Sequence, residues 1–281
     1  IIKYTDKANQ LPSLYRDLNL AGYHSSFYYG GETEFANIAA YLRQSGVSKI
    51  SDKADYSGAQ LNSKWGAHDE FVLNHQLQEL KIQKQPFFSV LLTLSNHEPF
   101  ETPNKPKFPG KDEADRFRSS AAYTDKCLQH YFKEASKYSW FSNTLFVLVA
   151  DHGHRLPQQN DLNMPKSKHI PLLFYGDVLK DAVKGTKINL AGNQHDIAAT
   201  LLPQLNLSAS AYTWSKNLLN PQTKGFGYYS NENVLGWISD SDTLVFSFLE
   251  MKDLVSPKKN RFEEEQAKAY LQTLYQEFLN Y

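Results

Sequence analysis

An apolar run that stops abruptly in polar residues constrains this chain more than any other stretch. Residues Leu145 to Ala150 (LFVLVA) follow Asn143-Thr144 and are all apolar. A short run rich in Val and Phe predicts a β-strand that is buried on both faces. The run ends in Asp151-His-Gly-His154, so we expect a carboxylate and two imidazoles at the carboxyl end of this strand. Ligands bind at that end of the strands in open α/β sheets.

The residues after this strand have the chemistry of a cation site. Carboxylate oxygens and imidazole nitrogens both ligate divalent metals, and Gly153 allows the backbone to turn sharply. The pattern therefore favours a divalent-metal site formed by Asp151 and the neighbouring histidines, His152 and His154. A simpler interpretation has Asp151 as the N-cap of a helix, followed by a surface histidine.

A second apolar run, from Phe87 to Ser95, leads into Asn96-His97. Neighbouring strands lie about 5 Å apart, so the imidazoles converge if the two strands are adjacent. His97 would then contact a substrate or protonate a leaving group. His154 is a second candidate catalytic residue, and His169 a candidate substrate contact. The competing interpretation of His97 is purely structural.

Helical and strand patterns alternate along most of the chain. This alternation predicts an α/β fold with a central, mostly parallel sheet flanked by helices. We expect a main part over residues 1–222 and a closing part, 223–281, of antiparallel strands plus a final helix. The expected helices cover residues 11–21, 35–44, 69–84, 112–137, 197–202 and 262–279. The expected strands cover residues 25–29, 47–51, 87–95, 145–150, 169–176, 226–230, 234–238 and 243–248.

Composition excludes some classes of function. Lys plus Arg and Asp plus Glu number 30 each, so no overall field favours nucleic acid or an anionic membrane. Cys127 is the only cysteine, which excludes an internal disulfide. No apolar run is long enough to cross a bilayer. Because the chain starts at Ile1 without a signal peptide, we expect it to be part of a longer protein.

An ordered series of motifs adds a more specific indication. The series resembles the sulfatase family of the alkaline phosphatase superfamily, and more narrowly the lipoteichoic acid synthase and phosphoglycerol transferase branch, between Leu11 and Leu202. In order, the motifs are Gly22-Tyr23, Phe27-Tyr-Tyr-Gly-Gly31, Phe35-Ala-Asn37, Trp65-Gly66, Leu94-Ser-Asn-His-Glu-Pro-Phe100, Tyr123-Thr-Asp125, Asp151-His-Gly153, His169-Ile-Pro-Leu and Asp196-Ile-Ala-Ala-Thr-Leu-Leu.

The resemblance implies an enzyme anchored in the inner membrane, with a catalytic domain outside the cytoplasm (periplasmic or at the cell surface). Such enzymes attack a phosphate or sulfate ester, here lipid- or glycan-linked, with a metal-activated Thr or a modified Cys or Ser, through a covalent intermediate. A Glu, the nucleophile and an Asp-His pair hold the divalent metal, which would be Mn, Mg, Zn or Ca. Asp151 and His152 match that pair, and His97 matches the substrate-binding histidine. Nucleic acid is not an expected partner.

The sequence also departs from the family pattern. The family's Glu ligand and nucleophile precede the segment that matches Leu11, so we expect the isolated chain to be inactive. Cys127 lacks the Cys-x-Pro-x-Arg surroundings of a sulfatase nucleophile.

The substrate pocket shows a further departure. A His, a Trp and an Arg line the glycerol-phosphate pocket of lipoteichoic acid synthases, and the positions here are Tyr29, Ala36 and Ile38. Loss of the guanidinium argues against glycerol phosphate itself. Tyr29 and Asn37 are candidate substrate contacts. The rival hypothesis is a non-catalytic domain that keeps the fold and binds a lipid headgroup or glycan.

Overall fold

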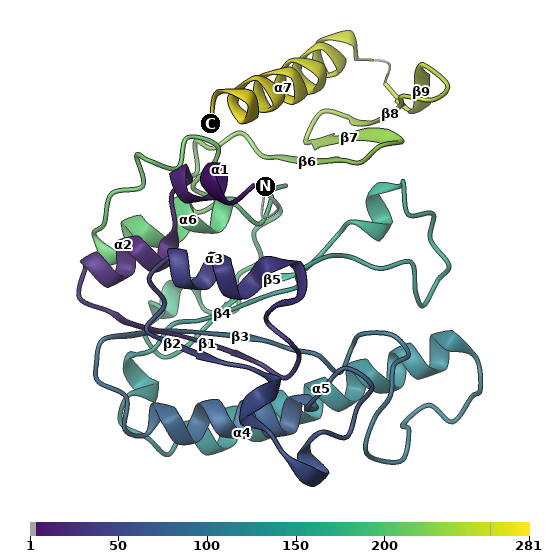
Figure 1. Cartoon of the computed structure of the whole chain (residues 1–281). Coiled ribbons are helices and arrows are strands. Elements are labelled where there is room, and N and C mark those ends of the chain that lie inside the picture. The colour runs from purple at the N-terminus through teal and green to yellow at the C-terminus, as the bar shows by residue number, and fades with distance from the viewer. Residues whose placement is uncertain (1–3, 259) are drawn as a thin grey trace. The chain divides into compact units, whose positions relative to one another are not determined.

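The computed structural model describes residues 4–258 and 260–281, and the chain divides into two compact units (Figure 1). Unit 1 is the chain up to Thr144 together with Leu156–Gln158. Unit 2 comprises Leu145–Arg155 and Gln159–Tyr281. The division expected at residue 222 stays a prediction.

Unit 1 is built on a parallel sheet with the strand order β2-β1-β3. Its strands are β1 (His24–Tyr29), β2 (Lys49–Ser51) and β3 (Phe87–Leu92). Its helices are α1 (Thr5–Gln10), α2 (Leu14–Leu20), α3 (Ile38–Gln44), α4 (Asp69–Leu80) and α5 (Glu113–Ala135). Parallel strands require crossover connections, which the helices supply. The predicted α/β class is confirmed. The helix expected over residues 11–21 corresponds to α2, whereas α1 was missed.

Helices cover both faces of this sheet. Phe27 packs with Tyr15 of α2 and Leu42 of α3, whereas the next residue, Tyr28, packs with Val72 of α4. Because successive side chains of a strand point to opposite faces, α2 and α3 lie on one side of the sheet and α4 and α5 on the other (Figure 1). Hydrophobic side chains therefore cover β1 on both faces of the sheet. Polar side chains that could serve a site lie at the ends of the strands.

The carboxyl ends of β1 and β3 lie at the same edge of the sheet, since Tyr29 pairs with Leu92 in the register. A backbone contact holds a third segment against this edge, as the Ala67 amide donates to the Gly30 carbonyl at 2.9 Å. Gly66 has φ +152°, and a Cβ there would lie 2.0 Å from the Gly30 oxygen. Glycine is therefore required at position 66, next to Trp65, where the chain passes close to the Gly30 backbone.

Unit 2 contains two antiparallel sheets. β4 (Phe146–Val149) pairs with β5 (Leu172–Tyr175), and a four-stranded sheet has the order β6-β7-β8-β9. The remaining elements are α6 (Asp196–Leu201), β6 (Phe226–Ser230), β7 (Val234–Ser239), β8 (Thr243–Ser247), β9 (Lys252–Val255) and α7 (Arg261–Asn280). The antiparallel C-terminal strands and the final helix were predicted from the sequence; β9 was missed.

The second sheet and α7 share a small core. Leu235, Trp237 and Leu244 pack with Ala267 of α7. The Trp237 indole nitrogen donates to Glu263 Oε2 at 2.7 Å, so the buried aromatic ring also has a polar partner on the helix. The aromatic and leucine side chains of these short strands thus pack against the apolar face of α7.

The predicted burial of β4 on both faces is wrong for unit 2 as the structure describes it. Val149 is 40% exposed, and Leu173 and Tyr175 on the partner strand are 53% and 44% exposed. The apolar run thus marks a strand correctly but overstates its burial, because the side chains of Phe146 to Leu148 are only half-buried and Val149 is exposed.

Helix starts account for the other differences. An aspartate at the start of an apolar helical pattern predicts an N-cap, so the sequence predicts Asp69 and Asp196 as caps. The N-caps of α4 and α6 are instead His68 and His195, and each aspartate is the first helical residue. The helix expected over residues 35–44 is interrupted, because Ala36 and Asn37 have positive φ values of 51° and 59°. Its regular part begins at Ile38.

Candidate functional site

His97 lies in a tight turn just beyond β3. The amide of His97 donates to the Leu94 carbonyl at 3.0 Å, and the Phe100 amide donates to the His97 carbonyl at 2.9 Å. The Nδ1 atom of His97 lies 3.0 Å from the Glu98 carbonyl oxygen. A carbonyl can only accept, so Nδ1 carries the proton and Nε2 keeps a free lone pair.

Trp65 fixes this turn from one side. Its indole nitrogen donates to the same Glu98 carbonyl at 2.6 Å. Its ring meets the His97 imidazole at 5.0 Å between centroids and an interplanar angle of 70°, an edge-to-face arrangement. Trp65 therefore restricts rotation of the His97 side chain. Sequence reasoning placed Trp65 in a motif but gave it no role in the site.

A buried carboxylate, that of Asp69, holds the backbone that leads into the His97 turn. Asp69 is fully buried, and its Oδ1 accepts from the amides of Leu94 at 2.7 Å and Ser95 at 3.1 Å. Its Oδ2 accepts from Thr124 Oγ1 of α5 at 2.6 Å. The backbone that leads from β3 into His97 is thus bonded to Asp69 of α4, and Thr124 of α5 bonds to that same carboxylate. Asp69 and Thr124 were not predicted to serve the site.

His68 completes this buried network. Its Nδ1 lies 3.0 Å from Ser95 Oγ, which also accepts from the Asp69 amide at 3.0 Å. Burial lowers the pKa of His68 below its ordinary value, more than the neighbouring Asp69 carboxylate raises it. From the sequence alone His68 is expected to be a surface or helix-face residue; that expectation is wrong, because its exposed fraction is 1%.

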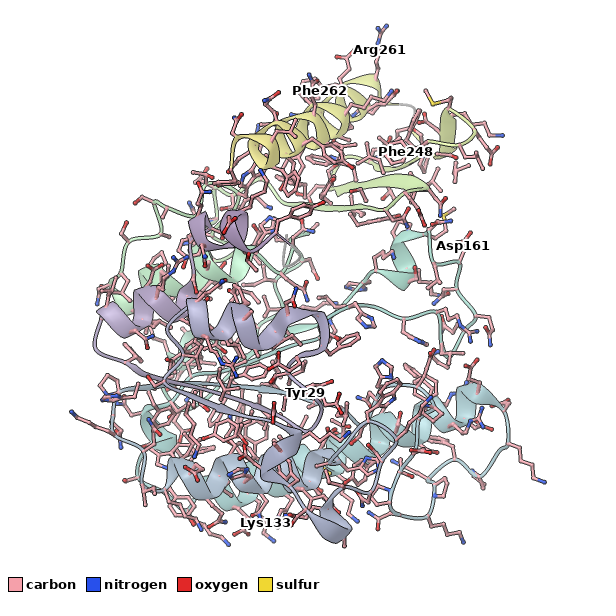
Figure 2. The ribbon with its side chains drawn as sticks, in the orientation of Figure 1. Tyr29, Lys133, Asp161, Phe248, Arg261 and Phe262 are labelled. Atoms are coloured by element: carbon pink, nitrogen blue, oxygen red, sulfur yellow. The ribbon has the colours of Figure 1, made fainter. Side chains whose placement is uncertain are left out.

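Two candidate substrate contacts belong to the same unit as His97. Tyr29 is the last residue of β1 (Figure 2) and pairs in register with Leu92 near the His97 turn. Asn37 is exposed and takes a left-handed conformation before α3. Tyr29 thus ends β1 and Asn37 follows it in the chain, and β3 leads to His97 from the same edge of the sheet.

Asp151 and His152 point their side chains at one another in unit 2. The Asp151 Oδ2 atom lies 3.5 Å from His152 Nε2, and the two side chains are 65% and 70% exposed. His152 Nδ1 lies 2.7 Å from the Gly153 carbonyl, so it is the protonated nitrogen and Nε2 is left to accept. The alternative interpretation, with Asp151 as a helix N-cap, is wrong, because Asp151 to Arg155 form no helix.

This spacing is that of two ligands on one cation. Ligand atoms about 2.1 Å from a tetrahedral metal are roughly 3.4 Å apart. A histidine ligand typically donates its other ring N–H to a carbonyl or carboxylate, as His152 does to Gly153. The donor atoms therefore fit a divalent cation. Among residues 4–258 and 260–281, however, no three His, Cys, Asp or Glu side chains are grouped so that they could hold a metal ion.

The segment that carries the pair is held from two sides. Gly153 lies directly against the backbone of residue 167, since a Cβ at Gly153 would stand 2.1 Å from the Ser167 oxygen. On the other side, Gln194 Nε2 lies 2.7 Å from the carbonyl oxygens of both Ala150 and Asp151. Gln194 is a residue that the sequence interpretation passed over, beside the recognised Asp196 motif.

The two remaining candidate histidines are in the same unit as Asp151. His169 is exposed, and its amide donates to the Pro165 carbonyl at 3.0 Å. His154 is half-buried, one residue beyond Gly153. Their roles, like the convergence of His97 with Asp151 and His152, stay predictions.

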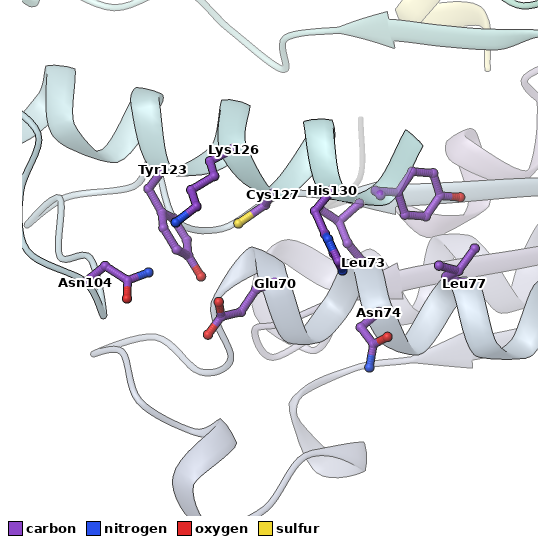
Figure 3. Close-up of a pocket in the computed structure, with 10 residues that line it drawn as sticks. Glu70, Leu73, Asn74, Leu77, Asn104, Tyr123, Lys126, Cys127 and His130 are labelled. Carbon is purple, nitrogen blue, oxygen red and sulfur yellow. The ribbon is translucent and has the colours of Figure 1, made fainter. Parts of the chain in front are cut away.

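Cys127 lies elsewhere in unit 1, in a cavity of about 170 Å³ between α4 and α5 (Figure 3). Tyr123, Leu73 and Leu77 also line this cavity. Burial raises the pKa of the Cys127 thiol to about 11, and only the thiolate is a strong nucleophile. A buried, protonated thiol is a poor nucleophile; that Cys127 is no substitute for the family nucleophile stays a prediction.

Comparisons with known proteins identify relatives. The family model described as Sulfatase matches residues 1–207. "Lipoteichoic acid synthase-like YvgJ" of Bacillus subtilis is 23% identical over 83% of this chain and 38% of its own length. "Lipoteichoic acid synthase 2" of the same species is 25% identical over 75% of this chain and 35% of its own length. The chain thus spans little more than a third of these relatives.

Solved structures agree on the fold. An alkaline phosphatase superfamily protein from Vibrio parahaemolyticus matches with a TM-score of 0.82 and 24% identity, over 99% of this chain and 71% of that one. The lipoteichoic acid synthase LtaP from Listeria monocytogenes matches with a TM-score of 0.75 and 17% identity, over 98% and 75%. No helix within residues 4–258 and 260–281 has the length and apolar character needed to span a membrane.

Proposed function

Because this chain belongs to the sulfatase family, we propose that it forms part of a divalent-metal-dependent enzyme that hydrolyses or transfers phosphate or sulfate esters. The relatives named as lipoteichoic acid synthases favour a phosphoglycerol-type transferase. By the same likeness, the enzyme would act outside the cytoplasm on a lipid- or glycan-linked ester and be attached to the membrane.

The observation that carries this proposal is the paired Asp151 Oδ2 and His152 Nε2, 3.5 Å apart. These atoms would hold the cation, and the Gly153 carbonyl would keep the imidazole in the tautomer that can ligate. One oxygen and one nitrogen donor suit Mn²⁺ or Zn²⁺ better than the harder Mg²⁺ or Ca²⁺. When bound, such a cation polarises the ester oxygen and activates the attacking hydroxyl.

His97 would act on the ester through Nε2. Because Nδ1 is committed to the Glu98 carbonyl, Nε2 can accept a proton from a substrate hydroxyl or, once protonated, donate to the leaving oxygen. Trp65 limits rotation of the ring, which favours a fixed geometry of transfer. We assign Tyr29, Asn37 and His169 to substrate contacts.

His154 is the weaker of the two catalytic candidates. It follows the Asp151–His152 pair by two residues, so it would move a proton beside the cation in place of His97 or together with it.

We further propose that the 281-residue chain alone does not turn over esters. A catalytic zinc site typically uses three protein ligands, and no such group occurs among the described residues. The additional ligand and the nucleophile would come from elsewhere in the complete protein.

The test compares metal content and turnover of p-nitrophenyl phosphate and p-nitrophenyl sulfate in the complete protein. Asp151→Asn and His152→Gln should each lower metal affinity and turnover by at least about tenfold. His130→Gln, an exposed change on α5 beside the α4–α5 cavity, is the matched control and should change neither. Variants at Asp151 and His152 that keep wild-type metal and turnover would refute the proposal.

The rival hypothesis, a non-catalytic binding domain, predicts a different result in the same experiments. A complete protein that binds a phospholipid headgroup or glycan, yet takes up no metal and cleaves neither ester, would be a binding domain that has kept the fold.

A further inference from the structure

The carbonyl groups that follow β4 need a donor from outside the sheet. The β4–β5 ladder ends at the pair Val149 and Leu172, so the carbonyls of Ala150 and Asp151 lie beyond it. Backbone carbonyls that leave a ladder must find another partner or water. Gln194 supplies that partner, with its Nε2 atom 2.7 Å from both oxygens.

The orientation of the Gln194 amide follows from chemistry. Both neighbours are carbonyl oxygens, which only accept, so the atom between them must be the NH₂ nitrogen with its two protons. Each proton can serve one carbonyl. A glutamate of the same length has no proton to give at neutral pH, and a leucine has none at any pH.

The neighbours of Gln194 hold it on a fixed platform. Asn193 pairs with the backbone of Tyr228 in β6, its Oδ1 accepting at 3.0 Å and its Nδ2 donating at 2.6 Å. Asp196 is fully buried and forms an ion pair with Lys216 at 2.8 Å. The Asp196 carboxylate also accepts from the amides of Asn193 at 2.8 Å and Lys216 at 2.7 Å. The turn on either side of Gln194 therefore cannot shift without breaking these bonds.

The two carbonyls that Gln194 contacts belong to the peptides on either side of the Asp151 Cα atom. A change in the peptide between Ala150 and Asp151 would rotate the Asp151 carboxylate relative to His152. Gly153 packs on the Ser167 carbonyl at the far end of the segment, so residues 150–153 are held at both ends. The distance between the two candidate ligand atoms is 3.5 Å. It would change if the contact at Gly153 or the bonds from Gln194 were lost.

We propose that Gln194 is a positioning residue for the metal-ligand pair, acting through the carbonyls of Ala150 and Asp151. The inference rests on the proposed function, because it gives Gln194 a role in metal affinity. Gln194 touches neither substrate nor cation in this role.

The first experiment measures Mn²⁺ affinity of the complete protein by calorimetry. Gln194→Leu and Gln194→Glu should each weaken binding by about tenfold or more, as loss of an outer support of a metal ligand does. Gln272→Leu, an exposed change on α7, is the control and should bind as the wild type does. The urea midpoint should be unchanged in Gln194→Leu, since Gln194 is itself exposed. Wild-type affinity in Gln194→Leu, or a loss matched by a fall in its urea midpoint, would overturn the positioning role.

The second experiment needs no metal. The carbonyl ¹³C resonances of Ala150 and Asp151 should move upfield together in Gln194→Leu and stay in place in Gln272→Leu, because the carbonyls lose a donor. Unmoved resonances would show that the two bonds do not exist in solution. If the resonances move as expected but wild-type protein binds no Mn²⁺, the contacts of Gln194 exist but the metal site of the proposed function is wrong. Gln194 then has no metal ligand to position.

Discussion

Replacing Asp69 by leucine removes the acceptors beneath the His97 turn while nearly preserving side-chain shape. Three donors bond to this carboxylate: the amides of Leu94 and Ser95 and the hydroxyl of Thr124. The Thr124 hydroxyl can turn to Asn96 Oδ1, 3.4 Å away. The two amides, in contrast, keep no partner in a buried setting.

The size of the effect follows from those two amides. A buried donor left unsatisfied costs about 1–3 kcal/mol, so Asp69→Leu should lower the free energy of unfolding by roughly 4 kcal/mol. That is a large part of the about 5–15 kcal/mol available to a typical domain. Asp69→Asn is the matched control. Its Oδ1 can still accept from both amides and its NH₂ can donate to Thr124, so it should cost only about 1 kcal/mol.

The assay is urea unfolding followed by ¹⁹F NMR of 5-fluorotryptophan. Trp65 and Trp140 report on unit 1, whereas Trp214 and Trp237 report on unit 2. We expect the midpoint of the unit 1 resonances to fall steeply in Asp69→Leu and slightly in Asp69→Asn. Equal midpoints for Asp69→Leu and wild type would refute the argument that this carboxylate holds the end of β3.

Three further predictions concern other sites. Gly153→Ala should lower the free energy of unfolding by about 2 kcal/mol, because a Cβ would stand 2.1 Å from the Ser167 oxygen; an unchanged urea midpoint would count against that close approach. Cys127 should react only slowly with a disulfide reagent in native protein at pH 8 and fast in urea, because its raised pKa of about 11 leaves roughly a thousandth as thiolate; fast stoichiometric labelling of native protein would contradict this. Stability should fall as the pH drops below about 6.5, because burial lowers the folded-state pKa of His68 and the unfolded chain then binds more protons. His68→Asn should flatten that profile of urea midpoint against pH, and an equally steep profile would exclude His68 as its source.

The strands and their polar ends could be predicted because both are local features of the sequence. A short apolar run predicts a strand, and the polar residues that follow it directly, Asp151-His152 or Asn96-His97, are predicted to lie at the end of that strand. The same local view predicted the parallel class of unit 1 from the alternation of helices and strands. The prediction of burial for β4 was wrong, because the burial of a strand depends on the segments that pack against it, and the residues of the strand alone do not identify those segments.

The supports of the site could not be predicted because they act over long separations. An aspartate at a helix start suggests an N-cap, yet Asp69 bonds to amides 25 and 26 residues away. Gln194 has no local pattern at all, and its partners lie 44 and 43 residues earlier. Only the fold brings these groups to the strand ends, so sequence patterns supplied the chemical groups of the site but not what holds them.

The central proposal is that Asp151 and His152 hold a divalent cation, and the convergence of His97 with this pair stays a prediction of the sequence. Paramagnetic Mn²⁺ added to the complete protein, labelled with ¹⁵N at histidine, tests both directly. The account predicts that the imidazole signals of His152 and His97 broaden together at low Mn²⁺, while that of His130, on α5 beside the α4–α5 cavity, stays sharp. Broadening of His152 with a sharp His97, or broadening of neither, would contradict the account.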